Sequence, residues 1–281
     1  MVGSAKAVMA PYWSNDEHGL TIYHGDCVEV MPQLEQRFDL CLTDPPYGIP
    51  VGSAMVRHDT KAIEDWRDAV ENVVVGGWLP MVAFADAAYC VEFGRSEPDA
   101  ITERNTRHAE CGLTPWHLLV IAKAAPTPTP RPTFASSYET ALVSYAGVRR
   151  WYGGGYVPNR WYGQMPNQLT STDAHPTQKP LAPFVSWMSA LSPENALVID
   201  PFIGSGTTLV ACYRLGRRGV GIEISEEYCE LAAKRLETEI AQRRLFEPAE
   251  IHAKPKQLST ELEAIATTAE AATTIVQDGE S

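Results

Sequence analysis

The sequence lacks the features that mark several large classes of protein. Its six cysteines form neither a Cys-x-x-Cys pair nor a Cys/His cluster with zinc spacing, which argues against a disulfide framework and a structural metal. No apolar run approaches the length of a membrane span, and residues 1–10 lack the long apolar core of a signal peptide. We therefore expect a cytoplasmic protein without membrane or metal, whose cysteines are small buried hydrophobes.

An excess of positive charge is also absent, since the formal net charge is −12. This balance argues against a protein that coats DNA, and it confines any affinity for nucleic acid to a local basic surface. Residues 131–190 carry five basic and two acidic side chains, although such an excess would also fit an ordinary solvated face. With 281 residues, of which 44% are hydrophobic, the chain can bury one sizeable core.

A short motif, Asp-Pro-Pro-Tyr at residues 44–47, is the first candidate for a functional site. It follows an apolar run, Phe38–Thr43, that predicts a strand, so it should lie at a strand's carboxyl end, where open α/β sheets bind ligands. The prolines hold the chain extended and offer no N–H, which leaves the Asp44 carboxylate and backbone carbonyls as acceptors beside the Tyr47 ring. This set suits a planar group with an NH₂, such as the exocyclic amine of a nucleobase. A proline turn that caps a strand is the plainer alternative.

A second candidate site lies in the carboxyl-terminal half. A predicted strand, Ala196–Ile199, leads into the loop Asp-Pro-Phe-Ile-Gly-Ser-Gly-Thr-Thr at residues 200–208, which opens a helix; a strand over Gly219–Ile224 follows, with Glu223 near its end. In nucleotide-binding half-sheets such glycines let the backbone approach the ligand, and the carboxylate meets ribose hydroxyls. The third glycine of Gly-x-Gly-x-x-Gly is replaced by Leu209, and Gly-Lys-Ser/Thr is absent. A ribose-bearing cofactor that needs no phosphate cradle, such as S-adenosylmethionine, therefore fits better than a dinucleotide or a Walker-type ligand.

Between these two sites, residues 147–173 are aromatic, rich in glycine and basic. Interleaved guanidinium groups and rings suit phosphate contact and base stacking, and they equally suit a compact loop packed by its own aromatics. The candidates for contact with nucleic acid are Arg149, Arg150, Trp151, Arg160 and Trp161.

The pattern of apolar residues predicts the remaining elements. It indicates strands over Leu20–His24, Trp78–Ala85, Trp116–Ala122 and Ser137–Tyr145, and helices over Cys27–Leu34, Ile63–Val75, Ala87–Phe93, Leu181–Leu191 and from Ser225 to about Arg244. Residues 1–19 read as irregular, residues 124–133 as an extended proline-rich segment, and residues 248–281 as a disordered tail.

Three motifs together resemble those of the DNA amino-methyltransferases. They are the Asp-Pro-Pro-Tyr motif, His-Pro-Thr-Gln-Lys-Pro at 175–180 and the loop at 200–208, in the order of the circularly permuted β group. The resemblance implies an α/β fold: a mostly parallel, seven-stranded, doubly wound sheet of the class I S-adenosylmethionine-dependent methyltransferase type, circularly permuted, with a small irregular target-recognition insertion. It implies one domain at 20–247, made of a catalytic half (20–145), a target-recognition segment (146–174) and a cofactor-binding half (175–247).

The resemblance also implies a role for each motif residue. The catalytic residues would be Asp44, Pro45, Pro46 and Tyr47. The residues that bind S-adenosylmethionine would be Asp26 at its adenine, Glu223 at its ribose, Thr177 and Lys179 at its methionine end, and Asp200, Phe202, Gly204, Gly206 and Thr207 along the loop. The chain departs from the family pattern where Trp116 and Lys123 lie seven residues apart, since the family often has Trp-x-Lys.

These roles imply a direct methyl transfer. Asp44 and a proline carbonyl would accept the two N–H bonds of a flipped base and favour a pyramidal nitrogen. A covalent enzyme intermediate is not expected, because ring-carbon cytosine methyltransferases need a cysteine, usually after a proline, and the chain has no Pro-Cys.

We therefore expect a site-specific methyltransferase that acts on the N6 amine of adenine in double-stranded DNA. The resemblance implies that aspartate rather than serine at position 44 favours the N6 amine of adenine over the N4 amine of cytosine. A methyltransferase of RNA or of a protein amide, and a non-catalytic DNA-binding module, stay open as alternatives. The resemblance also leaves open a homodimer, a cognate restriction enzyme as partner, and association with the nucleoid through DNA.

Overall fold

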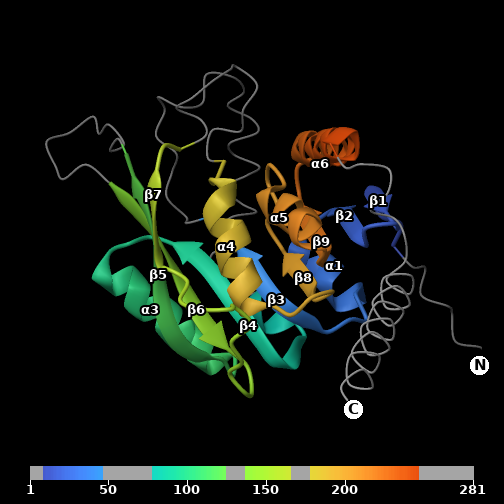
Figure 1. Ribbon diagram of the computed structural model, residues 1–281. Coiled ribbons are helices and arrows are strands. Elements are labelled where there is room, and N and C mark those ends of the chain that lie inside the picture. The colour runs from blue at the N-terminus through green and yellow to red at the C-terminus, as the bar shows by residue number, and fades with distance from the viewer. Residues whose placement is uncertain (1–8, 47–77, 125–136, 166–177, 247–281) are drawn as a thin grey trace, which may run out of the picture. The chain divides into compact units, whose positions relative to one another are not determined.

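The computed structural model describes residues 9–46, 78–124, 137–165 and 178–246 (Figure 1). The chain forms two compact units, Met1–Thr238 and Glu239–Ser281. Of the second unit, the structure describes only the end of one helix. All of the described strands lie in the first unit. Among the described helices, none is long and apolar enough to cross a membrane.

The described residues form nine strands and seven helical segments. The strands are β1 (Trp13–Asn15), β2 (Leu20–His24), β3 (Phe38–Thr43), β4 (Phe84–Gly94), β5 (Thr114–Lys123), β6 (Tyr138–Tyr145), β7 (Arg160–Gly163), β8 (Leu197–Asp200) and β9 (Arg218–Glu223). The α-helices are α1 (Cys27–Val30), α3 (Pro98–Glu110), α4 (Leu181–Leu191), α5 (Thr207–Leu215) and α6 (Glu226–Phe246), and the 3₁₀ helices are η1 (Met31–Gln33) and η2 (Leu79–Met81).

All nine described strands belong to one sheet, in the order β1-β2-β9-β8-β3-β4-β6-β5-β7. The strands β2, β9, β8, β3 and β4 run parallel, whereas β6 is antiparallel to both of its neighbours. The seven strands from β2 to β5 confirm the predicted mostly parallel sheet, and β1 and β7 extend it at its edges. The late strands β8 and β9 lie between the early strands β2 and β3 (Figure 1). The two halves of the sequence therefore meet in the middle of the sheet.

Helices α4 and α5 cover one face of the sheet. Phe93 of β4 stacks on Phe184 of α4, with ring centroids 5.4 Å apart. Gly219 of β9 lies directly under α5, because a Cβ at this position would come within 2.4 Å of Leu209. The two helices also contact each other (Figure 1). This face is therefore closed by two apolar helices that follow each other in the sequence.

Helix α1 packs against the opposite face. Because side chains alternate along a strand, Cys41, Cys90 and Val220 all point to this face, where they join the α1 residues Cys27 and Val30 in one apolar core. The central strands are thus covered on both sides, which explains their continuous apolar runs. Five of the six cysteines are buried and the sixth is partly buried, which confirms their predicted place in the core.

The sequence prediction is wrong between Trp78 and Phe93. In the strand expected over Trp78–Ala85, Leu79–Met81 form η2 and only Phe84 and Ala85 are strand residues, and the helix expected over Ala87–Phe93 belongs to β4. Every residue from Ala88 to Gly94 is buried, so the strand shows no alternation of apolar and polar residues, and its alanines suggested a helix. The pattern also missed β1, in the segment expected to be irregular, and β7. The helix predicted at 63–75, the tail predicted at 248–281 and all but the first residue of the proline-rich segment predicted at 124–133 lie outside the described residues.

Helix α3 was also missed, because it contacts the sheet through charged rather than apolar side chains. Its buried residues are Arg104 and His108. His108 bridges two strands: its Nε2 lies 2.7 Å from Glu92 Oε2, and its Nδ1 lies 2.9 Å from Ser144 Oγ. Arg107 pairs with the other oxygen of Glu92. Burial would raise the pKa of Glu92, but the hydrogen bond from His108 and the charge of Arg107 outweigh it and hold the pKa below its usual value.

Replacing Glu92 by glutamine should lower the free energy of unfolding at pH 7 by about 3–5 kcal/mol, because the Arg107 guanidinium, whose side chain is only 17% exposed, loses its carboxylate partner. The loss should shrink as the pH falls, since a carboxyl whose folded pKa is lowered stabilises the fold above its ordinary pKa of 4.5 and loses that contribution below it. Urea unfolding at pH 7 and at pH 4 measures both effects. Glu103→Gln makes the same change on the exposed side of α3 and should cost under about 0.5 kcal/mol. Equal losses in the two variants would contradict the role of the network.

Candidate active site

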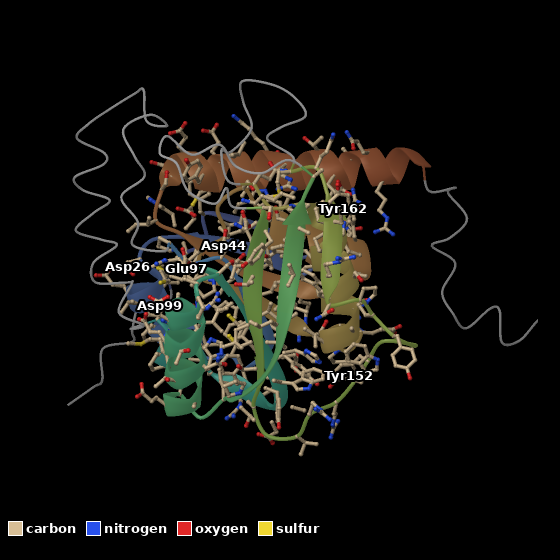
Figure 2. All side chains as sticks on the ribbon, turned by 90° about the vertical axis from the view of Figure 1, so that its left-hand side faces the viewer. Asp26, Asp44, Glu97, Asp99, Tyr152 and Tyr162 are labelled. Carbon is tan, nitrogen blue, oxygen red and sulfur yellow. The ribbon has the colours of Figure 1, made fainter. Side chains whose placement is uncertain are left out.

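The site is built where the carboxyl ends of the parallel strands meet at one edge of the sheet. Asp44 follows β3, Asp200 ends β8, Glu223 ends β9, and Asp26 comes two residues after β2. These four strands are parallel neighbours, so the four carboxylates come from one edge. The structure thus places the Asp-Pro-Pro-Tyr motif where the sequence predicts it, with Tyr47 itself outside the described residues. Figure 2 labels Asp26 and Asp44.

Asp44 belongs to a cluster of alternating charges. It pairs with the ammonium of Lys179, which also lies 3.1 Å from Glu139 Oε2. The other oxygen of Glu139 lies 3.0 Å from Lys123 Nζ. The side chain of Lys179 is only 8% exposed, so water screens these pairs weakly.

The surroundings of Lys179 and Glu139 stabilise their charged forms. Burial would lower the pKa of Lys179, but the charges of Asp44 and Glu139 outweigh it and raise that pKa. Burial would raise the pKa of Glu139, but the charges of Lys179 and Lys123 outweigh it and lower that pKa. Both groups are therefore ionised at neutral pH.

Glu139 and Lys123 are site residues that the sequence motifs did not indicate. Lys123 ends β5 and Glu139 is the second residue of β6, and this antiparallel pair brings them to the edge that carries Asp44. The order of strands, which places β6 beside β4, was the missing information. The expected position of Lys179 at the methionine end of a cofactor also did not include its contact with Asp44.

Asp200 joins the predicted cofactor loop to the catalytic strand. Its Oδ1 accepts hydrogen bonds from the Thr43 hydroxyl (2.7 Å) and the Phe202 N–H (3.1 Å), and its Oδ2 accepts one from the Thr208 hydroxyl (2.6 Å). Burial raises the pKa of Asp200 to about 6, while these three donors favour its ionised form. The residue next to Asp44 is therefore bonded directly to the first residue of the loop.

The rest of the loop is shaped by Glu223 and by two glycines. The two carboxylate oxygens of Glu223 accept the N–H groups of Gly204 and Ser225, each at 3.0 Å. Burial raises the pKa of Glu223. Gly204 and Gly206 have φ angles of +48° and +81°, a region that other residues rarely adopt. The loop thus turns back against β9 and leads into the N-terminus of α5.

The other predicted cofactor residues hold the backbone around this loop. Asp26 Oδ1 accepts the Val28 N–H at 2.9 Å and caps α1. Phe202 packs edge-on against Trp78, with ring centroids 5.6 Å apart. Thr207 is buried, and its hydroxyl lies 3.0 Å from Arg235 Nη1. Thr177 lies outside the described residues.

The comparisons with known proteins agree with this arrangement. A model of the N6_N4_Mtase family, described as DNA methylase, matches residues 114–234. Over 268 residues the chain is 25% identical to the type II methyltransferase M.ScaI of Streptomyces caespitosus. The matched region covers 83% of this chain and 86% of that protein. The crystal structure of the M1.HpyAVI–SAM complex is similar at a TM-score of 0.59 and 27% identity, over 77% of this chain and 98% of that one. Together these matches support a DNA amino-methyltransferase.

Two further matches show less, because one covers a short part of the chain and the other has a low sequence identity. Type II methyltransferase M.HpaI of Haemophilus parainfluenzae is 49% identical over 65 residues, which are 23% of this chain and 21% of that protein. The structure of PvuII DNA methyltransferase, described as cytosine-N4-specific, is similar at a TM-score of 0.57 over 83% of this chain and 88% of that one. At 17% identity, the second match shows the fold alone.

The candidates for DNA contact do not lie together. Arg149, Arg150 and Trp151 follow the carboxyl end of β6, which is the sheet edge opposite to Asp44. Arg160 and Trp161 lie in β7, which runs parallel to β5 and ends beside Lys123. Tyr152, which follows the first group in sequence, and Tyr162, which follows the second, are well separated in Figure 2.

The first of these two groups packs on Trp116 of β5. The Arg149 guanidinium lies 4.7 Å from the ring centre of Trp116, and Trp151 meets that ring edge-on at 6.4 Å. The loop after Trp151 lines an apolar pocket of about 640 Å³ together with Trp116 and Trp187. Arg149 and Trp151 thus pack on the sheet through Trp116, and contact with DNA stays a prediction for these residues as for Arg160 and Trp161.

Substitution of Gly206 tests how closely the loop packs against α6. Gly206→Ala should cost more stability than Gly216→Ala, although both residues have positive φ angles and each alanine would cost about 1–2 kcal/mol for that reason. A Cβ at Gly206 would also lie 3.1 Å from Ala232 Cβ and 3.3 Å from its Cα, whereas a Cβ at Gly216 meets nothing within 4 Å. Urea unfolding of both variants measures the difference. Equal losses would show that α6 gives way and that the loop is not closely packed.

Proposed function

We propose that this protein transfers a methyl group from S-adenosylmethionine to the N6 amine of an adenine flipped out of double-stranded DNA. One observation carries the proposal: the Thr43 hydroxyl, one residue before Asp44, donates a 2.7 Å hydrogen bond to Asp200, the first residue of the predicted cofactor loop. Because β3 and β8 are neighbouring parallel strands, an amine held by Asp44 and a methyl donor held by the loop would lie side by side.

The residues around the loop fit S-adenosylmethionine. Each carboxylate oxygen of Glu223 accepts one N–H and has a second lone pair, so Glu223 can also accept hydrogen bonds from ribose hydroxyls. Asp26 lies beyond β2, the strand that pairs with β9 in register from Leu20 to His24, so it would meet the adenine next to that ribose. The related M1.HpyAVI was solved in complex with SAM. When bound, the cofactor supplies an electrophilic methyl group on a sulfonium centre.

Asp44 would activate the amine of the target base. The nitrogen lone pair of adenine's amine is delocalised into the ring, and acceptance of an N–H bond by Asp44 favours a pyramidal nitrogen whose lone pair is available. As the nitrogen–carbon bond forms, the carbon–sulfur bond breaks, and the nitrogen then loses one proton, for which the Asp44 carboxylate is an acceptor. Flipping the base costs about a few kcal/mol, which stacking on an aromatic side chain such as Tyr47 offsets by about 1–3 kcal/mol.

The modified nucleoside identifies the target. Unmethylated DNA of high sequence complexity is incubated with the purified protein and S-adenosylmethionine, digested to nucleosides and analysed by mass spectrometry. We expect N6-methyladenine. N4-methylcytosine would move the specificity to the other amine that the same acceptors can hold. The absence of any methylated nucleoside across varied sequences would overturn the proposed function.

Replacing Asp44 by alanine should lower the rate of methyl transfer by at least about 10²–10³-fold, because the amine loses its acceptor. The affinity for S-adenosylmethionine, measured by calorimetry, should change little. Asp99→Ala removes an exposed aspartate from the first turn of α3 and serves as the control, with wild-type activity. A wild-type rate in Asp44→Ala would remove Asp44 from the mechanism.

A further inference from the structure

Lys179 can hold Asp44 in place only if its own ammonium is fixed. A lysine side chain has four flexible carbons and carries about 2 kcal/mol of rotamer entropy, so a single contact with Asp44 would orient neither group. The structure provides two further contacts for Lys179 Nζ: Glu139 Oε2 at 3.1 Å and the ring centre of Phe93 at 5.6 Å. The ammonium therefore lies among two carboxylates and an aromatic face.

Glu139 is itself fixed by the sheet. It is the second residue of β6, opposite Ile121 of β5, and the Lys123 N–H donates a 2.8 Å hydrogen bond to the Ser137 carbonyl two residues earlier. Its Oε1 lies 3.0 Å from Lys123 Nζ, while its Oε2 faces Lys179. The position of Glu139 is thus fixed by β6 and by Lys123, independently of Lys179 and Asp44.

The four charges balance within the cluster. Asp44 and Glu139 are the two carboxylates, Lys179 and Lys123 are the two ammoniums, and along the chain of contacts the signs alternate. The side chains of Lys179 and Lys123 are 8% and 10% exposed, so these pairs are not ordinary surface ion pairs, which contribute little. Loss of one partner would leave a buried charge poorly compensated, and the remaining side chains would move.

We propose that Glu139 is a positioning residue for the methyl transfer: from the start of β6 it holds Lys179 against Asp44 and so fixes the carboxylate that accepts the amine. This role rests on the proposed function, since it concerns the same acceptor. Glu139 acts through Lys179 and does not touch the substrate. A displacement of Asp44 by about 1 Å is enough to cost about 10²-fold in rate.

The test compares Glu139→Gln with the wild type in single-turnover reactions at saturating DNA and S-adenosylmethionine. The transfer rate should fall by about 10–100-fold, whereas the affinities for DNA and for S-adenosylmethionine should stay within about threefold, because only the geometry of the acceptor changes. Glu139→Asp keeps the charge on a side chain one methylene shorter, so it should recover part of the lost rate.

Glu97→Gln is the matched control. Glu97 also forms an ion pair, with Arg95 at 3.5 Å, and it follows the carboxyl end of β4, but its side chain is 56% exposed. Its loss should leave the transfer rate unchanged. Glu97 is labelled in Figure 2.

Three results would overturn the positioning role. They are a folded Glu139→Gln protein with the wild-type rate, a loss of cofactor affinity as large as the loss of rate, and a Glu139→Asp protein no more active than Glu139→Gln. If Glu139→Gln does not fold, Glu139→Asp decides, since a reduced rate at unchanged affinities supports the role and a wild-type rate excludes it. A wild-type protein without methyl transfer would instead refute the proposed function, so the two failures are distinguishable.

Discussion

The parallel pairing of β3 with β8 is the constraint on which the rest of this structure depends. It joins a strand near residue 40 to one near residue 198 and brings Asp44 and Asp200 to the same edge. The pairing is completed by the hydrogen bond from Thr43 to Asp200 and by the bond from the Leu197 N–H to Asp39 at the other end of the strands. A shift of register by one residue would turn these side chains to the wrong face, so the buried contacts fix the geometry of the site.

Buried charge is used in two different ways around this sheet. Under α3, Glu92 pairs with Arg107 and His108 at a helix that has few apolar residues, and these polar contacts replace hydrophobic packing. At the active-site edge, Lys179 and Glu139 form part of a network that ends on Asp44, a group with a chemical role in the proposed function. In both places buried charges have partners of opposite sign, because an unpaired charge in a weakly screened place is costly.

Much of the fold could be predicted from sequence because the central strands and the helices α4 and α5 carry strong local patterns. The failures have physical causes. The strand β4 is covered on both faces and so shows no alternation, and α3 contacts the sheet through Arg104 and His108 and so shows no apolar stripe. The short edge strands β1 and β7 are defined by their hydrogen-bonded neighbours, which a local pattern does not contain.

By itself the sequence determined which chemical groups are present and which of them begin or end an element: the acceptors at Asp44, the glycine loop and the carboxylate at Glu223. Only the tertiary structure decided which of these groups meet. It gave Lys179 the partners Asp44 and Glu139, and it separated Arg149 from the edge that carries Asp44. The reason is that local sequence fixes the direction of a strand's side chains, whereas the order of strands in the sheet depends on contacts between residues far apart in the chain.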